Sequence, residues 1–169
     1  MTSQNNEGFK FVTSATLRTI AGKRDIEPSY SSGETPTGTI KSPDRPRLPL
    51  PDADMSPNSI RLARGCADAY AVRLAHHNED LHYKNCPRNL QASLAFDALE
   101  QARCEALGFE EMKGVGSNLN AVLEEKCKRS GFENITKADQ ASLPDALHVL
   151  TRLELTGEDT PPAAEKLVG

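Results

Sequence analysis

His76, His77, His82 and Cys86 form the closest group of metal-ligand side chains in the sequence. Imidazole and thiolate are groups that zinc and cobalt accept. On one continuous helix, however, His77 and His82 would be turned about 140° from each other and would not share a face. His82 and Cys86 are four residues apart and form a better pair, but two ligands do not close a site. We therefore predict that this chain binds no metal, and favour a surface or helix-end role for these residues.

Two further stretches come close to metal and nucleotide loops. Asp54-Met-Ser-Pro-Asn-Ser is near the Asp-x-Ser-x-Ser loop that holds Mg²⁺ through oxygen ligands, but its second serine comes one position late. Ser56 followed by Pro57 is better explained as the start of a helix. Gly22 and the lysine after it lack the upstream glycine of a phosphate loop, and Arg24 takes the hydroxyl position. We expect the chain to bind neither Mg²⁺ nor ATP by itself.

A run of carboxylates could perform acid–base chemistry only in a pocket that excludes water and shifts their pKa values. No nucleophile and no glycine-rich anion loop lies near them in the sequence, so we interpret them as solvated helix faces or a docking patch. His148, isolated from other such residues, is interpreted as packed or solvated, and we predict no catalytic residue. The carboxylates are Glu100, Glu105, Glu110 and Glu111, with Arg103 among them.

Helical periodicity begins after Ser56 and continues almost to the end of the chain. Apolar residues recur at helical spacing from Ile60 to Leu81, which predicts a first long helix from Pro57 to about His82. Further helices are expected over about 90–107, from Met112 or Ser117 to Arg129, and over 143–156, each followed by a glycine suited to a helix end. These glycines are Gly108, Gly131 and Gly157.

The ends of the last helices carry their own signals. Ser142 is placed as an N-cap with Asp145 three residues later, an imperfect capping box. Pro161 and Pro162 begin what we expect to be the first turns of a fifth helix. Helices joined by short turns can bury a shared apolar stripe, so the pattern predicts an antiparallel helical bundle.

The segment before Pro57 has a different character, because repeated proline removes amide donors and prevents long helices or central strands. We expect an extended arm, with polyproline II conformation from about Pro43 to Pro51. A short helix is expected from Ala15 to Ala21, a strand around residues 25–27, and another strand at Phe9 and Phe11. The predicted division is thus an arm over residues 1–57 and a helical bundle domain over 58–169.

Composition agrees with a mainly α fold. The 169 residues are 37% hydrophobic but only 5% aromatic, with no tryptophan, so the core should be aliphatic. The net charge of −4 and the lack of basic runs argue against nucleic acid as a partner. No signal sequence or membrane span is evident, so we expect a cytoplasmic protein with no membrane partner. The four cysteines are expected to be reduced, Cys86 being the most exposed.

Several segments, in this order along the chain, resemble the amino-terminal region of the CobT family. They are Ala15-Thr-Leu-Arg-Thr-Ile-Ala-Gly-Lys23, Arg64-Gly-Cys-Ala-Asp-Ala-Tyr-Ala-Val-Arg-Leu-Ala-His-His77, Glu100-Gln-Ala-Arg-Cys-Glu-Ala-Leu-Gly108, Met112-Lys-Gly-Val115 with Asn118-Leu119, Glu133-Asn-Ile-Thr136, and Leu155-Thr-Gly157 with Pro161-Pro162. The resemblance covers essentially the whole chain from about residue 9. Asn78 stands where the family resemblance leads us to expect aspartate.

This resemblance implies a subunit of the aerobic cobaltochelatase, a ligase-type complex that uses ATP and Mg²⁺ to insert Co²⁺ into hydrogenobyrinic acid a,c-diamide in cobalamin biosynthesis. The implied partners are a AAA+ ATPase subunit (CobS-like) and the large chelatase subunit (CobN-like). The acidic linker and von Willebrand A domain of the family are not matched here. The matched residues therefore imply docking and assembly, with no cofactor bound by this chain.

Three hypotheses remain open at this point. The first is a non-catalytic scaffold that offers arginines to the AAA+ partner, the docking residues being Arg61, Arg64, Arg73 and Arg103. The second is a small helical protein that presents cobalt through His77, His82 and Cys86. The third is a stand-alone helical interaction protein that has kept the family's fold without its partners.

Overall fold

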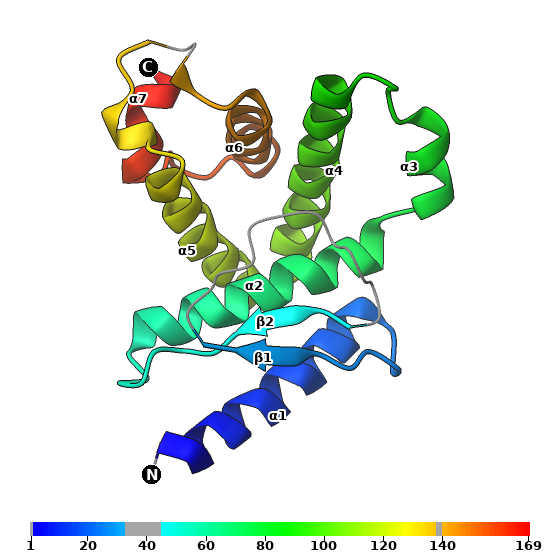
Figure 1. The fold of residues 1–169 in the computed structure, drawn as a ribbon, viewed down its shortest axis with the longest axis vertical. Coiled ribbons are helices and arrows are strands. Elements are labelled where there is room, and N and C mark those ends of the chain that lie inside the picture. The colour runs from blue at the N-terminus through cyan, green and yellow to red at the C-terminus, as the bar shows by residue number, and fades with distance from the viewer. Residues whose placement is uncertain (1, 33–44, 138–139) are drawn as a thin grey trace.

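The computed structural model describes residues 2–32, 45–137 and 140–169, and it is mainly α-helical, as expected (Figure 1). The α-helices are α1 (Thr2–Ala21), α2 (Pro57–His76), α3 (Glu79–Asn85), α4 (Leu90–Glu111), α5 (Lys113–Arg129), α6 (Leu143–Thr156) and α7 (Glu165–Val168). Two 3₁₀ turns, η1 (Phe132–Asn134) and η3 (Pro162–Ala164), and two short strands, β1 (Ser29–Ser31) and β2 (Arg47–Pro49), complete the elements used below.

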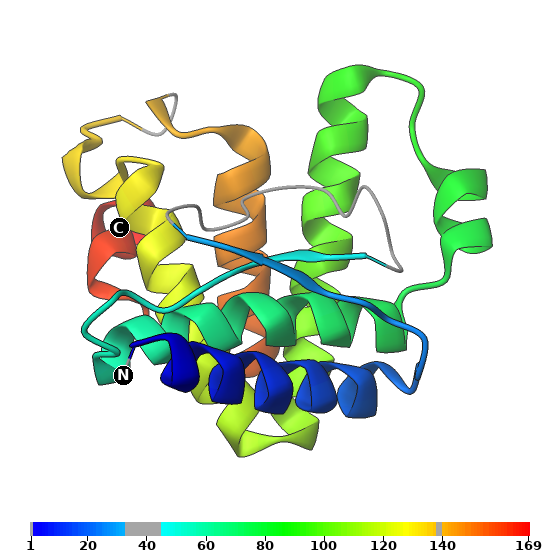
Figure 2. The same ribbon diagram turned by 60° about the horizontal axis from the view of Figure 1, so that its bottom comes forward.

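Helix α2 lies across the middle of the molecule and contacts α1 on one side and α4 and α5 on the other. Figure 2 shows α1 and α2 side by side, with α4 and α5 standing on α2 and α6 beside α4. Helix α5 runs opposite in direction to α4 and α6, which pack along each other. Helices α4 and α5 are thus antiparallel, as predicted, whereas α4 and α6 pack in parallel, and α2 crosses α4 and α5.

The start of α2 follows the capping prediction, whereas its end does not. The Ser56 hydroxyl accepts a hydrogen bond from the Ser59 amide at 3.3 Å, with Pro57 at the first helical position. The predicted continuation to His82 is wrong, because His77 leaves the helix in an extended conformation. The Asn78 side chain then accepts from the Leu81 amide at 2.9 Å and starts the separate helix α3.

Glycines allow α2 to approach its neighbours closely. A Cβ at Gly65 would clash with the Asn118 carbonyl and with Val122 of α5. A Cβ at Gly108 would clash with Val72 of α2. The prediction that Gly108 ends its helix is therefore wrong: α4 continues to Glu111, and the glycine serves helix packing instead.

The N-terminal segment contains a longer helix than predicted. Phe9 and Phe11 lie in α1 and not in a strand, and the strand predicted there is wrong. The buried residues recur every four positions, at Phe9, Thr13, Leu17 and Ala21, while Phe11 is 77% exposed. This helical stripe outweighs the two-residue alternation of the phenylalanines. Helix α1 ends before Gly22, as expected.

Residues after α1 return along α2. The strand predicted at residues 25–27 is wrong: this stretch forms no strand, and Ile26 is buried there as an apolar anchor. Pairing begins after Pro28, where β1 joins β2 in a parallel register with Tyr30 opposite Leu48. The polyproline II stretch predicted from Pro43 begins outside the described residues, and its described part contains β2.

These N-terminal elements share an apolar cluster with α2. The cluster consists of Leu17, Ala21, Ile26, Leu48, Ala67 and Ala71. The Tyr30 hydroxyl lies 2.8 Å from the Ser14 hydroxyl, and Arg18 donates to the Ile26 carbonyl at 2.8 Å. The division into an arm over residues 1–57 and a separate bundle stays a prediction. The shared cluster joins the two parts, so unfolding experiments can test it.

The C-terminal helices lie close to where they were expected. Helices α5 and α6 end before Gly131 and Gly157, both with positive φ. The last turns form η3 and α7 after Pro161. Their shared cluster contains Leu123, Cys127, Phe132, Val149, Ala163 and Ala164. Within the described part of the chain, no helix combines the length and apolarity needed to cross a bilayer.

Candidate functional site

Two carboxylates on α4 organise the junction between α2, α3 and α4, which we call the histidine corner. Asp97 and Glu100 are three residues apart and therefore neighbours on one face of the helix. Each carboxylate contacts one arginine and one histidine. The histidine corner consists of Arg73 and His77 at the end of α2, His82 of α3, and Asp97, Glu100 and Arg103 of α4.

Arg73 forms the buried half of the corner. Its guanidinium donates to Asp97 Oδ1 at 2.6 Å, and the residue is only 8% exposed. His82 Nε2 lies 3.5 Å from the same Asp97 oxygen. Burial, followed by the nearby His77 ring, lowers the pKa of His82. The charge of Arg73, which was predicted to dock a partner, is therefore paired inside the protein.

Glu100 anchors the other half. Arg103 donates to both of its oxygens, at 2.8 Å from Nε and 2.7 Å from Nη2, and His77 Nδ1 lies 2.8 Å from Oε1. Burial raises the pKa of Glu100, but the hydrogen bonds from Arg103 and His77 outweigh it and lower the pKa to about 2. A carboxylate with so low a pKa is a poor general base at neutral pH.

Arg103 also closes the end of α2. Its Nη2 donates to the carbonyl oxygen of His76 at 2.8 Å, in the last turn of the helix. This carbonyl would otherwise lack an intrahelical partner. The arginine therefore supports the break between α2 and α3, although it is partly exposed and was nominated for docking.

The break brings together two histidines that the sequence argument had kept apart. The rings of His77 and His82 have centroids 4.8 Å apart and meet edge to face. The prediction that they lie on different faces of one helix is wrong, because α2 ends at His76 and α3 folds back. His82 also packs against Phe96 of α4, with ring centroids 4.8 Å apart.

Cys86 stands apart from the other metal candidates. Its Sγ lies 3.1 Å from the Ser93 hydroxyl at the connection between α3 and α4. Among the described residues, no group of three or more histidine, cysteine, aspartate or glutamate side chains is arranged to hold a metal ion. The histidine corner instead pairs its carboxylates with arginines, which would compete with a metal for them.

Arg61 and Arg64 differ from the other two nominated arginines. They are three residues apart on α2, neighbours on its surface, and both are exposed. Neither forms an ion pair with another residue in the described ranges. By contrast, Arg73 and Arg103 are engaged within the chain. The docking role of all four remains a prediction. The structure separates an exposed pair on α2 from a pair that is engaged within the chain.

A second charged centre lies inside the bundle, and the sequence interpretation missed it. Glu105 was expected on a solvated face, but it is 4% exposed, and this expectation is wrong. Its Oε2 lies 3.1 Å from Arg152 Nη1 and 3.2 Å from His148 Nε2, and its Oε1 accepts from Gln101 at 2.9 Å. Burial raises the pKa of Glu105, but His148 and Arg152 outweigh it and hold the pKa well below its usual range.

Arg152 has several acceptors at this centre besides Glu105. The residue is 1% exposed, and it also donates to the Leu119 carbonyl and to Asn120 Oδ1, at 3.2 Å and 2.7 Å. His148 Nδ1 lies 3.3 Å from the Lys126 ammonium, which can only donate. One sequence signal pointed here: Arg152 lies four residues after His148 and three after Val149, on the inward face of its helix.

The buried thiols are poor nucleophiles. Cys66, Cys104 and Cys127 are buried and unpaired by disulfides, and Cys86 is the more exposed, as expected. Burial raises the pKa of Cys66 and of Cys104 to about 12. The reactive thiolate is therefore scarce at these positions at neutral pH.

Comparison with known proteins gives one family. The family model described as "Cobalamin biosynthesis protein CobT" matches residues 3–169, almost the whole chain. No solved structure matches the chain.

Proposed function

The chain belongs to the CobT family and so has a role in cobalamin biosynthesis, and from this premise we propose that it is a non-catalytic docking region of a cobaltochelatase. In this proposal it binds a AAA+ ATPase subunit of the CobS type, which acts in turn on the large CobN-type subunit. The complex uses ATP and Mg²⁺ to insert its substrate Co²⁺ into hydrogenobyrinic acid a,c-diamide. The protein would work in the cytoplasm, where these components are expected.

One observation carries the docking proposal: α2 presents Arg61 and Arg64 to solvent, without an ion-pair partner in the part of the chain that the structure describes. The corner and the buried centre both compensate their charges within the chain, whereas these two guanidinium groups stay exposed, although the charge of Arg64 also acts on the buried Asp68. Helix α2 also touches α1, α4 and α5, so a partner bound to it would contact the element that joins the parts of the fold. Arginine is favoured at interfaces because it can bind carboxylates through two hydrogen bonds.

The proposal is tested by measuring binding to the cognate AAA+ subunit at low and at physiological salt. We expect the unmodified chain to bind, with affinity that falls as salt rises. The double variant Arg61→Ala/Arg64→Ala should bind about tenfold more weakly, from two exposed charge contacts. Its matched control is Lys84→Ala/Arg88→Ala, which removes two exposed bases near α3.

The outcomes separate the parts of the proposal. No binding by the unmodified chain at low salt would overturn docking altogether. Equal binding by the Arg61→Ala/Arg64→Ala variant and the chain itself would show that α2 does not make the contact. Arg73 is a poor test residue, because its removal would take the arginine counter-charge from Asp97 and disturb the fold.

Cobalt presentation is the second candidate, favoured by the close approach of His77 and His82. Calorimetric titration with Co²⁺ tests it, comparing the chain with His77→Gln/His82→Gln. Binding that is stoichiometric and lost in the variant would support this function over docking alone. Heat no greater than that of a buffer titration would remove it.

A further inference from the structure

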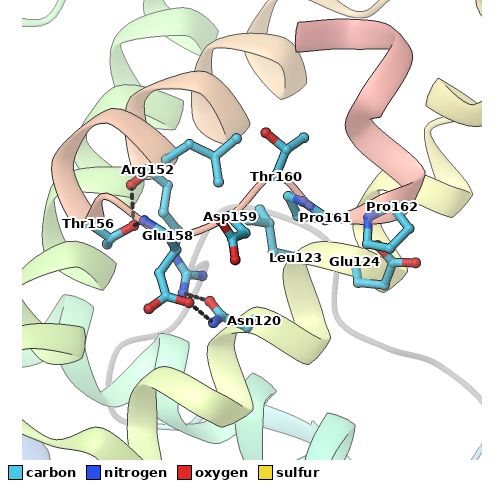
Figure 3. A pocket seen from close by; sticks show the side chains of 11 residues that line it. Asn120, Leu123, Glu124, Arg152, Thr156, Glu158, Asp159, Thr160, Pro161 and Pro162 are labelled. Atoms are coloured by element: carbon cyan, nitrogen blue, oxygen red, sulfur yellow. Dashed lines mark hydrogen bonds between the residues drawn. The ribbon is translucent and has the colours of Figure 1, made fainter.

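A cavity of about 230 Å³ lies between α5, α6 and the loop that joins α6 to η3 (Figure 3). One side is polar, formed by Arg152, Asn120 and Glu158, where Asn120 donates to Glu158 at 3.0 Å. The other side is apolar and includes Leu123 and Pro161. The loop is tied to α5 at both ends, because the Ala163 amide also donates to Glu124 at 3.1 Å.

The cavity is small for a metabolite or nucleotide. Sites for small molecules usually occupy about 300–1,000 Å³. This volume suits a single long side chain of another polypeptide. Apolar walls favour the aliphatic stem of such a side chain, whose polar head can remain at the mouth.

The charges at the mouth of the cavity determine whether it favours a positive or a negative side-chain head. Glu158 and Asp159 are exposed carboxylates beside the cavity, and neither forms an ion pair within the described ranges. Arg152 does not neutralise them, because its charge is already paired with Glu105. Glu124 is likewise engaged, with Lys128 at 3.1 Å. The mouth therefore carries uncompensated negative charge.

We propose that this cavity receives one arginine side chain of a partner polypeptide. The aliphatic stem packs against Leu123 and Leu153, and the guanidinium meets the carboxylates of Glu158 and Asp159. Arginine fits better than lysine because its planar fork has enough donors for two neighbouring carboxylates. The inference rests on the docking proposal only for the source of the arginine.

A titration with N-acetyl-arginine-methylamide, followed by amide resonances in NMR spectra, tests the cavity without any partner. We expect saturable shifts at Asn120, Leu123 and Asp159. The citrulline analogue, which has the same shape without the charge, should give none, and the tryptophan analogue should give none. Absence of shifts with the arginine probe, or equal shifts with either analogue, overturns the inference.

Isosteric variants make the test specific. Glu158→Gln/Asp159→Asn should abolish the shifts, while the amide oxygen introduced at position 158 can still accept a hydrogen bond from Asn120. The matched control is Glu79→Gln/Asp80→Asn, which neutralises the same dipeptide on α3 and should leave the shifts unchanged. Retained shifts in the cavity variant, with the spectrum of a folded protein, contradict the assignment.

Binding to the AAA+ subunit then separates this inference from the docking proposal. If the unmodified chain binds, the cavity variant should bind about tenfold more weakly. Equal binding overturns the cavity as the contact and leaves docking through α2 standing. If the unmodified chain does not bind, docking fails, and the arginine probe alone decides the cavity.

Discussion

Glu105 and Arg152 form an ion pair that joins α4 to α6 inside the protein, at 3.1 Å. Such a pair gives little net stability compared with apolar packing, but removing one member leaves the other charge buried and uncompensated. Both groups have further partners, so the pair forms part of a connected polar network. The network also fixes how α4, α5 and α6 are placed, because Arg152 binds Leu119 and Asn120 of α5.

The first prediction follows from this network. Glu105→Gln should lower the free energy of unfolding by roughly 3–5 kcal/mol, because Arg152 loses its counter-charge. Urea unfolding followed by circular dichroism measures the change. The control Glu110→Gln, on the exposed side of α4, should change it by less than about 0.5 kcal/mol. If Glu105→Gln changed the free energy of unfolding as little as the control does, the Glu105–Arg152 pair would not support the fold.

Asp68 is a buried acid at the contact between α2 and α5. It is 4% exposed, and its Oδ2 accepts from Asn118 at 2.7 Å across this contact. Burial raises the pKa of Asp68 to about 6, although the Asn118 hydrogen bond and the charge of Arg64 oppose this. The folded state therefore binds the proton more tightly than the unfolded chain does.

The second prediction is the resulting pH dependence. Because the folded-state pKa is raised, the contribution of Asp68 is most favourable below about pH 4 and is lost as pH rises through about 6. Asp68→Asn removes the ionisation and keeps an acceptor for Asn118. The variant should be more stable than the unmodified chain by about 3 kcal/mol at pH 7, a difference that vanishes near pH 4. Unfolding in urea at several pH values checks this, and a constant difference would contradict it.

At the scale of elements, the close crossing of α2 over α4 and α5 depends on two glycines, which have no side chain. Gly65 faces the Asn118 carbonyl of α5, and Gly108 faces Val72. Backbone atoms cannot move aside as flexible side chains can, so the contact at Gly65 is the stricter one. The two glycines set how closely the helices approach.

The third prediction tests this approach. Gly65→Ala should destabilise the protein by roughly 1–3 kcal/mol, because the new methyl group pushes α2 away from α5. Gly8→Ala is the matched control in α1, where a Cβ meets no atom within 4 Å. That substitution should stabilise the protein by up to about 1 kcal/mol through helix propensity alone. Thermal unfolding of both variants makes the comparison, and stabilisation by Gly65→Ala would contradict the packing argument.

At the scale of the whole molecule, the N-terminal elements share a core with α2. Leu17, Ile26 and Leu48 are almost completely buried, and they pack with Ala67 and Ala71. Helix α2 in turn contacts α4 and α5. Destabilising the N-terminal cluster should therefore also destabilise the rest of the chain.

The fourth prediction concerns this coupling. Leu17→Ala should cost roughly 2–5 kcal/mol, the usual range for a buried leucine. Protection of α4 and α6 amides against hydrogen exchange should fall by the same free energy. The control Phe11→Ala removes a larger but exposed side chain from α1 and should have little effect. Unchanged protection of α4 and α6 in Leu17→Ala would favour a separate N-terminal unit, as the division near Pro57 predicts.

Local chemistry in the sequence determined most helix ends. Ser56 with Pro57, Gly22, Gly131 and Gly157 act through their own backbone and close neighbours, so their roles could be predicted without a fold. The apolar stripes of α4, α5 and α6 were equally evident, since a helix repeats its faces regardless of what covers them. The mainly α class and the buried cysteines followed from the same patterns.

The tertiary structure decided every feature that depends on a distant partner. Helix α2 stops after His76, where Arg103 takes a carbonyl 27 positions earlier in the chain. Glu105 is buried because Arg152, 47 positions later, meets it, while Glu110 on the same helix stays exposed. Periodicity shows which face of a helix is apolar, but it does not show which charge will find a counter-charge there. Which charges become paired depends on the packing of helices that are far apart in sequence. The same packing decides which arginines are paired inside the protein and which stay exposed to a partner.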